Sequence, residues 1–285
     1  STQGYSSAAS DVYKRQVLVD RDGLLWIGFY QLGVDYTLFQ SDLFSTYQYE
    51  NLFDSRDMAV RTIAFHGSQK LIGSRDGFVF IDEADGRFQI FKTPRLRASI
   101  IVSSCYFDGK YYIGTYGGGM YVLDGATLEL RDFEIASEPF QHGHIFVLRP
   151  DDRGNLWIGT SAGLYCYRNG KIVRHYTSDS SKVPEGNVYE IYFDSSQKMW
   201  VFLERGGIVL LDAPSLKVIR DIWSDEMKPF ASSIVVTSYC EDEFSGNLII
   251  GTLNHGILIY DKQYGKIRRA KGKKASRTLA QSLTV

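Results

Sequence analysis

Proline is scarce in this sequence, with 6 residues in 285, and cysteine is scarcer, with 3. Cys105, Cys166 and Cys240 are odd in number and widely spaced, with no CxxC motif, so we interpret them as buried free thiols and not as metal or redox sites. Neither sign of charge is in excess, since 32 basic residues stand against 33 acidic ones, and this balance creates no overall field to attract nucleic acid or an anionic membrane. No apolar run reaches the roughly 18–20 residues of a membrane helix, and the N-terminus lacks the pattern of a signal peptide.

Glycine and aromatic residues, by contrast, are abundant. The chain has 27 Gly, 19 Tyr and 17 Phe, a balance typical of many short strands joined by glycine turns. With 44% hydrophobic residues the chain is long enough for one large domain or two small ones, and it is neither disordered nor collagen-like. The composition therefore predicts an all-β protein.

The first sixteen residues stand apart from the rest. Residues 6–16, SSAASDVYKRQ, resemble the translation of a common transposon sequencing adapter. We therefore expect residues 1–16 to be a non-native, disordered leader that packs against nothing, and the genuine chain to start near Val17 as part of a longer protein. A natural leader rich in Ser and Ala is the alternative.

A repeat of about 40–50 residues runs through the remaining sequence. A turn, then an apolar strand that ends in Gly, recurs six times, most completely as RGNLWIGT over residues 153–160. The repeat markers are Gly28, Gly73, Gly114, Gly159, Phe202 and Gly251, with steps of 45, 41, 45, 43 and 49 residues. A second glycine follows each marker and opens another apolar run, at Gly33, Gly77, Gly119, Gly163, Gly207 and Gly256. The fifth repeat departs from the pattern because Phe202 replaces the glycine.

Each repeat reads as four antiparallel strands joined by tight turns. A sheet of this size has two apolar faces, so neighbouring sheets must stack face to face around an axis, as the blades of a β-propeller do. We predict six four-stranded blades over residues 17–270, followed at 271–285 by the truncated approach to a further blade. The repeated glycines serve tight turns and close packing, and Trp26, Trp157 and Trp200 are predicted to anchor the core.

The stretch from Asp151 to Leu164 reads D-x-x-G-N-L-W-I-G-T-x-x-G-L. This pattern resembles the repeat of two-component regulator propellers, whereas the Trp-Asp dipeptides of WD repeats and the paired glycines of kelch repeats do not match. Over residues 17–285 the chain is similar to the periplasmic sensor region of hybrid two-component histidine kinases of the type that regulates glycan utilisation. The resemblance implies that the chain is most of one seven-bladed propeller, truncated on both sides.

The resemblance also implies a function. Such sensors are part of an inner-membrane protein, bind oligosaccharides outside that membrane and pass the signal to a kinase, which this chain lacks. The implied partners are an oligosaccharide, an adjacent propeller and an immunoglobulin-like module of the parent chain, and a second protomer in a homodimer. No cofactor is expected.

Propellers bind ligands where the hairpins between second and third strands meet the loops between blades. A sugar site also needs aromatic faces and planar polar groups. These two conditions select ten candidates, which are Tyr30, Arg75, Arg95, Arg97, Tyr116, His142, His144, Glu204, Arg205 and His255.

Catalytic and metal-binding signals are weak. There is no local nucleophile–base pair, and His142 and His144 form a close pair without a third ligand, so no metal site and no enzyme are predicted. Two alternatives stay open, a glycosidase or lyase with two carboxylates facing each other across the channel and a protein-interaction scaffold.

A basic cluster lies near the C-terminus and consists of Lys266, Arg268, Arg269, Lys271, Lys273, Lys274 and Arg277. It has no interleaved aromatic residues. We therefore interpret it as a solvated loop between blades and expect no nucleic-acid binding through this region.

Overall fold

The computed structural model describes residues 60–92, 100–137, 139–177, 186–204, 207–213, 215, 217–219 and 222–270, together with the backbone of three strands before them. The chain divides into two compact units, Ser1–Asn51 and Leu52–Val285.

The first unit contains a three-stranded antiparallel sheet in the order β1 (Lys14–Val19), β2 (Leu24–Phe29) and β3 (Gly33–Leu38). Strand β1 begins three residues before the boundary that we predicted, and Lys14 pairs with Phe29. The assignment of residues 14–16 to a disordered leader is therefore wrong, because strand pairing uses backbone groups that any residue supplies. Residues 1–13 lie outside the described residues.

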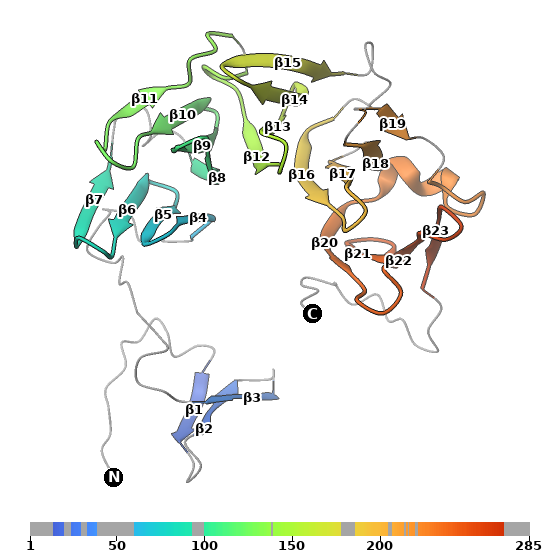
Figure 1. Ribbon diagram of the computed structural model, residues 1–285. Helices are drawn as coiled ribbons and strands as arrows, with labels where there is room; N and C mark the ends of the chain where they lie inside the picture. The colour runs from blue at the N-terminus through green and yellow to red at the C-terminus, as the bar shows by residue number, and fades with distance from the viewer. Residues whose placement is uncertain are drawn as a thin grey trace. The chain divides into compact units, whose positions relative to one another are not determined.

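The second unit contains five four-stranded antiparallel sheets, each made of strands consecutive in sequence (Figure 1). The second repeat forms β4 (Thr62–His66), β5 (Gln69–Gly73), β6 (Phe78–Asp82) and β7 (Arg87–Phe91). The third forms β8 (Ile100–Phe107), β9 (Lys110–Tyr116), β10 (Met120–Leu123) and β11 (Leu130–Asp132), and the fourth forms β12 (Ile145–Pro150), β13 (Leu156–Thr160), β14 (Gly163–Arg168) and β15 (Lys171–Tyr176).

The fifth repeat forms β16 (Val188–Phe193), β17 (Lys198–Leu203), β18 (Gly207–Asp212) and β19 (Lys217–Ile219), and the sixth forms β20 (Val236–Glu241), β21 (Leu248–Thr252), β22 (Gly256–Asp261) and β23 (Lys266–Arg269). A short 3-10 helix, η1 (Lys228–Ser233), lies between these two sheets in sequence. Five of the six predicted four-stranded blades are thus confirmed, and the first repeat contributes three described strands. The 271–285 segment lies outside the described residues.

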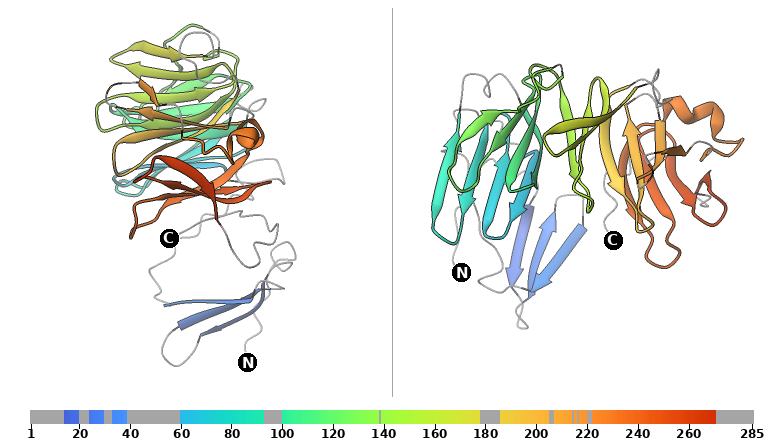
Figure 2. Two further views of the ribbon diagram at one scale, coloured as in Figure 1. Left: turned by 90° about the vertical axis from the view of Figure 1, so that its right-hand side faces the viewer. Right: turned by 45° about the horizontal axis from the view of Figure 1, so that its top comes forward.

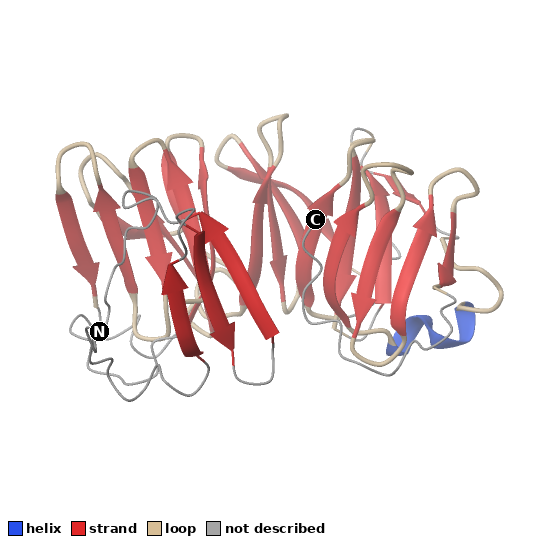
Figure 3. Ribbon diagram, turned by 90° about the horizontal axis from the view of Figure 1, so that it is seen from below, coloured by secondary structure: helices blue, strands red, loops and turns tan. Residues whose placement is uncertain are grey.

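Neighbouring sheets of the second unit pack face to face, as the views in Figures 2 and 3 show. A separate cluster of buried residues fills each interface between neighbouring sheets. Alternate residues of one strand belong to the clusters on its two sides. In β13, Leu156 and Ile158 join the cluster shared with the third repeat, whereas Trp157 joins the one shared with the fifth. This alternation follows from the two-residue period of a strand. Trp157 and Trp200 are fully buried, so their predicted role as core anchors is confirmed.

The repeat motif forms a turn that is held by an aspartate. The Asp151 carboxylate accepts hydrogen bonds from the backbone N–H groups of Arg153 and Asn155 and from Trp157 Nε1 at 2.9 Å. Asp194 makes the equivalent bond to Trp200 Nε1 at 3.1 Å. The aspartate therefore ties the turn to the tryptophan that follows it six residues later, which explains why the two recur together.

The basic cluster differs from the sequence-based expectation. Lys266, Arg268 and Arg269 lie in strand β23, whose Ile267 is fully buried, so this part is not a loop. All three basic residues are exposed in this edge strand. Lys271, Lys273, Lys274 and Arg277 lie outside the described residues. No helix in the described part of the chain is long and apolar enough to cross a membrane.

Candidate functional site

The predicted binding residues concentrate at one end of the sheets. Because successive strands alternate in direction, the hairpins between second and third strands lie at the same end as the loops that join the sheets. Backbone hydrogen bonds connect the two sets, from Ser161 N to His144 O and from Glu204 N to Asn187 O. Tyr116, His144 and Glu204 lie at this end, as do Arg75, His142 and His255.

A β-bulge recurs in the first strand of four of the five sheets of the second unit. In β12, Ile145 pairs with Thr160 and Val147 with Gly159, so Phe146 is skipped. Tyr189 is skipped in the same way in β16. Val102 and Thr237 occupy the equivalent positions in β8 and β20. Bulges re-aim side chains, and of the skipped residues Phe146 is half-buried and Tyr189 is exposed.

Two of the bulge residues extend a row of aromatic rings that begins with two predicted candidates. Tyr116 and His144 have ring centroids 4.1 Å apart, and Phe146 and Tyr189 have centroids 4.4 Å apart. His144 connects the two pairs, since its ring lies 5.8 Å from that of Phe146. The row thus crosses three sheets and ends at Tyr189, which is 42% exposed.

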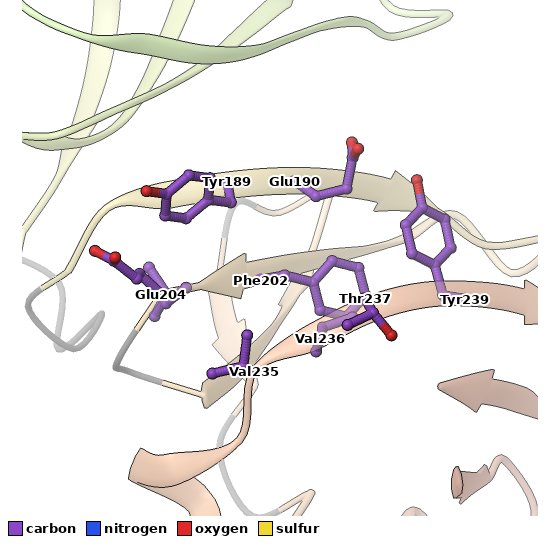
Figure 4. A pocket seen from close by; sticks show the side chains of 9 residues that line it. Tyr189, Glu190, Phe202, Glu204, Val235, Val236, Thr237 and Tyr239 are labelled. Atoms are coloured by element: carbon purple, nitrogen blue, oxygen red, sulfur yellow. The ribbon is translucent and has the colours of Figure 1, made fainter. Parts of the chain in front are cut away.

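A pocket of about 390 Å³ opens beside Tyr189, between the fifth and sixth sheets (Figure 4). Its lining comes from β16, β17 and β20 and from the residues next to them. We call it the Tyr189 pocket, lined by Tyr189, Glu190, Phe202, Leu203, Glu204, Val235, Val236, Thr237 and Tyr239. Of the six predicted candidates that the structure describes, only Glu204 lies in this lining.

The pocket lies at the place where the fifth repeat has Phe202 instead of the repeat glycine. In the fourth repeat, a Cβ on Gly159 would lie 2.5 Å from Val147 Cγ1 and 2.6 Å from Val188 Cγ1, so only glycine lets β16 approach β13. Phe202 stands at the equivalent place in β17 and lies against Tyr239 of β20, with ring centroids 5.1 Å apart. The backbones of β12 and β16 approach each other more closely than those of β16 and β20, which meet through Tyr192 and Tyr239, with ring centroids 4.8 Å apart.

The polar side chains of the described lining carry two carboxylates, two phenols and the hydroxyl of Thr237. Asn187 Nδ2 donates to Glu204 Oε2 at 2.7 Å. Arg149 Nη2 donates to Glu190 Oε1 at 3.0 Å. Burial, and then the nearby Glu190 carboxylate, raise the pKa of the Tyr239 phenol, so it stays protonated and can donate a hydrogen bond at neutral pH.

The other candidates that the structure describes do not line the pocket. His255 contacts Ser233 Oγ through Nε2 at 3.1 Å and Arg269 Nη2 through Nδ1 at 3.1 Å. Burial, followed by the Arg269 charge, lowers the pKa of His255. Arg75 and His142 are exposed. Tyr30, Arg95, Arg97 and Arg205 lie outside the described residues.

Eight of the nine pocket residues escaped sequence reasoning, because they belong to strands or directly adjoin them and the prediction considered loops alone. Tyr189, Phe202, Thr237 and Tyr239 are examples. The replacement of glycine by Phe202 was the one signal in the sequence that could have located the pocket. Within the described ranges, no group of three His, Cys, Asp or Glu side chains is arranged to hold a metal ion.

Residues 139–162 match the family described as Two component regulator propeller. This segment contains β12, β13 and the first part of the Asp151–Leu164 motif, so the resemblance to that repeat is confirmed there. No curated protein matches the chain in sequence.

Solved structures share the fold. One is the extracellular domain of a B. thetaiotaomicron protein described as a hybrid two-component system, with a TM-score of 0.58 and 18% identity over 98% of this chain and 35% of that one. The WD40 β-propeller domain of Doa1 has a TM-score of 0.52 and 11% identity over 90% and 82%. YCF48 bound to D1 peptide has a TM-score of 0.54 and 11% identity over 92% and 82%. The fold is an all-β propeller, and the chain spans about a third of the B. thetaiotaomicron domain.

Proposed function

We propose that this chain is a non-catalytic, ligand-sensing propeller of a hybrid two-component sensor kinase, located outside the cytoplasm, and that its ligand is an oligosaccharide bound in the Tyr189 pocket. The family match at residues 139–162 and the similarity to an extracellular domain of such a system support the sensor role. The observation that carries the ligand assignment is the aromatic platform at Tyr189.

The platform has the properties that a sugar requires. Phe146 covers one face of the Tyr189 ring at 4.4 Å, with a 34° angle between the planes, and thereby holds the ring in place. The Tyr189 side chain also lines the pocket, where its ring can pack against the C–H face of a pyranose. Carboxylates and phenols around the platform can bind hydroxyl groups, as Figure 4 illustrates with Glu190, Glu204 and Tyr239.

Signalling follows from the position of the pocket between two sheets. A ligand that contacts both β16 and β20 favours one spacing of the two sheets, and such a bias can pass to neighbouring domains as a rigid-body change. The recipients would be an adjacent propeller, an immunoglobulin-like module and a second protomer, and the output would be a kinase elsewhere in the parent chain.

Titration calorimetry with a panel of neutral and acidic tetrasaccharides tests the proposal. We expect binding without turnover, and at least a tenfold loss of affinity in Tyr189→Ala but not in Tyr189→Phe, which keeps the ring. Tyr264→Ala is the matched control, because Tyr264 is 71% exposed in the hairpin at the opposite end of the sixth sheet.

Other outcomes identify the alternatives. Two glutamates line the pocket, so hydrolysis or elimination of a bound glycan, abolished by Glu204→Gln, would establish an enzyme instead. Absence of all saccharide binding together with peptide binding would favour a scaffold, the alternative that the similar fold of YCF48 bound to a peptide supports.

A further inference from the structure

The charge of the Tyr189 pocket restricts the ligand that it can hold. Among the described residues, the lining includes two glutamates, Glu190 and Glu204, and no lysine, arginine or histidine. Every charged group of this described lining is thus an acceptor of hydrogen bonds with a negative charge.

The two carboxylates differ in how far that charge is compensated. Glu190 forms an ion pair with Arg149 at 3.0 Å and also accepts a hydrogen bond from Ile191 N at 3.0 Å. The Arg149 guanidinium forms a further hydrogen bond, in which its Nε donates to Ile191 O at 3.2 Å. Arg149 therefore neutralises Glu190, and its guanidinium also interacts with the Tyr239 phenol.

Glu204 is compensated far less. Among the described residues, its carboxylate is bonded by a neutral amide, Asn187 Nδ2, which meets Oε2. Asn187 is itself held by the backbone bond from Glu204 N. The amide fixes the orientation of the carboxylate but leaves its negative charge in place, and it leaves acceptor capacity on Oε1 for a ligand.

We propose, on the basis of the function assigned above, that the Tyr189 pocket selects uncharged oligosaccharides and rejects those bearing carboxylate or sulfate groups, with Glu204 as the residue that determines this specificity. A carboxylate accepts hydrogen bonds from two neighbouring sugar hydroxyls, which are charge-assisted and stronger than bonds between neutral groups. An anionic group at the same place meets like charge in a partly desolvated pocket and loses hydration without a compensating positive charge from the described lining.

The test compares neutral tetrasaccharides of glucose, galactose and mannose with the matching tetrasaccharides of glucuronic, galacturonic and mannuronic acid. For the unmodified protein at 0.05 M salt, we expect the best neutral ligand to bind at least tenfold more tightly than its acidic counterpart. In Glu204→Gln the neutral ligand should lose about tenfold in affinity, and the neutral-to-acidic ratio should fall below about threefold. Raising the salt to 0.5 M should lower the neutral-to-acidic affinity ratio of the unmodified protein and leave the ratio of Glu204→Gln unchanged.

Glu243→Gln is the control, because Glu243 is an exposed carboxylate in the turn between β20 and β21, at the far end of the sheet from the pocket. It removes the same charge from the protein and should leave the ratio as it was. Equal or tighter binding of the acidic series, or an unchanged ratio in Glu204→Gln, overturns the specificity proposal while the sensing proposal stands. Failure of every tetrasaccharide to bind overturns both.

Discussion

The ring of Phe202 lies against the ring of Tyr239, with centroids 5.1 Å apart and planes 23° apart. This contact joins β17 to β20 at a place where the other repeats have glycine. In the third repeat a Cβ on Gly114 would come within 2.7 Å of Ile145 Cγ2, and in the second a Cβ on Gly73 would come within 2.6 Å of Ile101 Cγ2. Glycine thus lets the next sheet close in, and Phe202 acts as a spacer that keeps the pocket open.

Phe202→Gly tests the spacer role. We expect β20 to move toward β17 and the affinity for whichever saccharide binds to fall at least tenfold, because the pocket loses both its width and one wall. Truncating a buried Phe costs about 3–5 kcal/mol when the space stays empty, and less if the sheets close. Calorimetric titration and urea denaturation measure the two effects.

Phe244→Gly is the matched control for this variant. Phe244 is 99% exposed in the turn after β20, so its loss should change neither binding nor, by more than about 0.5 kcal/mol, stability. Unaltered saccharide affinity in Phe202→Gly would contradict the spacer role.

Gly159→Ala makes the reverse change in the fourth repeat. The new methyl group would lie 2.5 Å from Val147 Cγ1, 2.6 Å from Val188 Cγ1 and 2.8 Å from Val188 O, two side chains and a backbone atom that cannot all yield. We expect a loss of about 1–3 kcal/mol in the free energy of unfolding, as in overpacked cores. Urea denaturation checks it, and a loss below about 0.5 kcal/mol would show that the sheets are not closely packed at this point.

The sequence allowed the repeat, and with it the stacked sheets, to be predicted, because glycine spacing and strand alternation are local signals. The Asp151–Trp157 pair illustrates this, since one turn contains both the motif and its hydrogen bond. The pocket could not be predicted in the same way. Tyr189 faces the pocket only because β16 is bulged between Val188 and Glu190, and Tyr239 lines it only because Phe202 stands 37 positions earlier in a neighbouring sheet. The positions of both tyrosines depend on pairing and packing between strands, which local sequence patterns do not specify.

The cysteines provide a test of how tightly the sheets are packed. Burial raises the pKa of the Cys105 thiol to about 12 and that of Cys166 to about 11, so at pH 8 almost none of either is the reactive thiolate. Iodoacetamide at pH 8 should leave both unmodified in the folded protein and label all three cysteines after unfolding in urea, as mass spectrometry of the peptides would record. Cys240 is only half-buried and serves as the internal comparison. Rapid labelling of Cys105 in the folded state would contradict this packing.

Asp194 should make the stability of the protein depend on pH. Its carboxylate is buried and accepts hydrogen bonds from Ser196 and Lys198 N and from Trp200 Nε1, and Lys262 Nζ lies 3.3 Å away. Burial alone would raise the pKa of Asp194, but the hydrogen bonds and the Lys262 charge outweigh it and lower the pKa below its ordinary 3.8. A group whose pKa is lower in the folded state stabilises the protein above its unfolded pKa and loses that contribution as the pH falls through the folded value.

Asp194→Asn should therefore cost about 3 kcal/mol at pH 7, because the fully buried Trp200 Nε1 and Lys262 lose a charged acceptor. The difference between variant and unmodified protein should shrink progressively as the pH falls below about 4, because the unfolded chain then takes up the proton and the folded protein takes it up only at its lower pKa. Urea denaturation at pH 7 and pH 3 measures it, and Asp152→Asn, an exposed residue of the turn before β13, should stay within about 0.5 kcal/mol at both. A difference that is the same at pH 7 and pH 3 would mean that Asp194 acts through the shape of its turn and not through its charge.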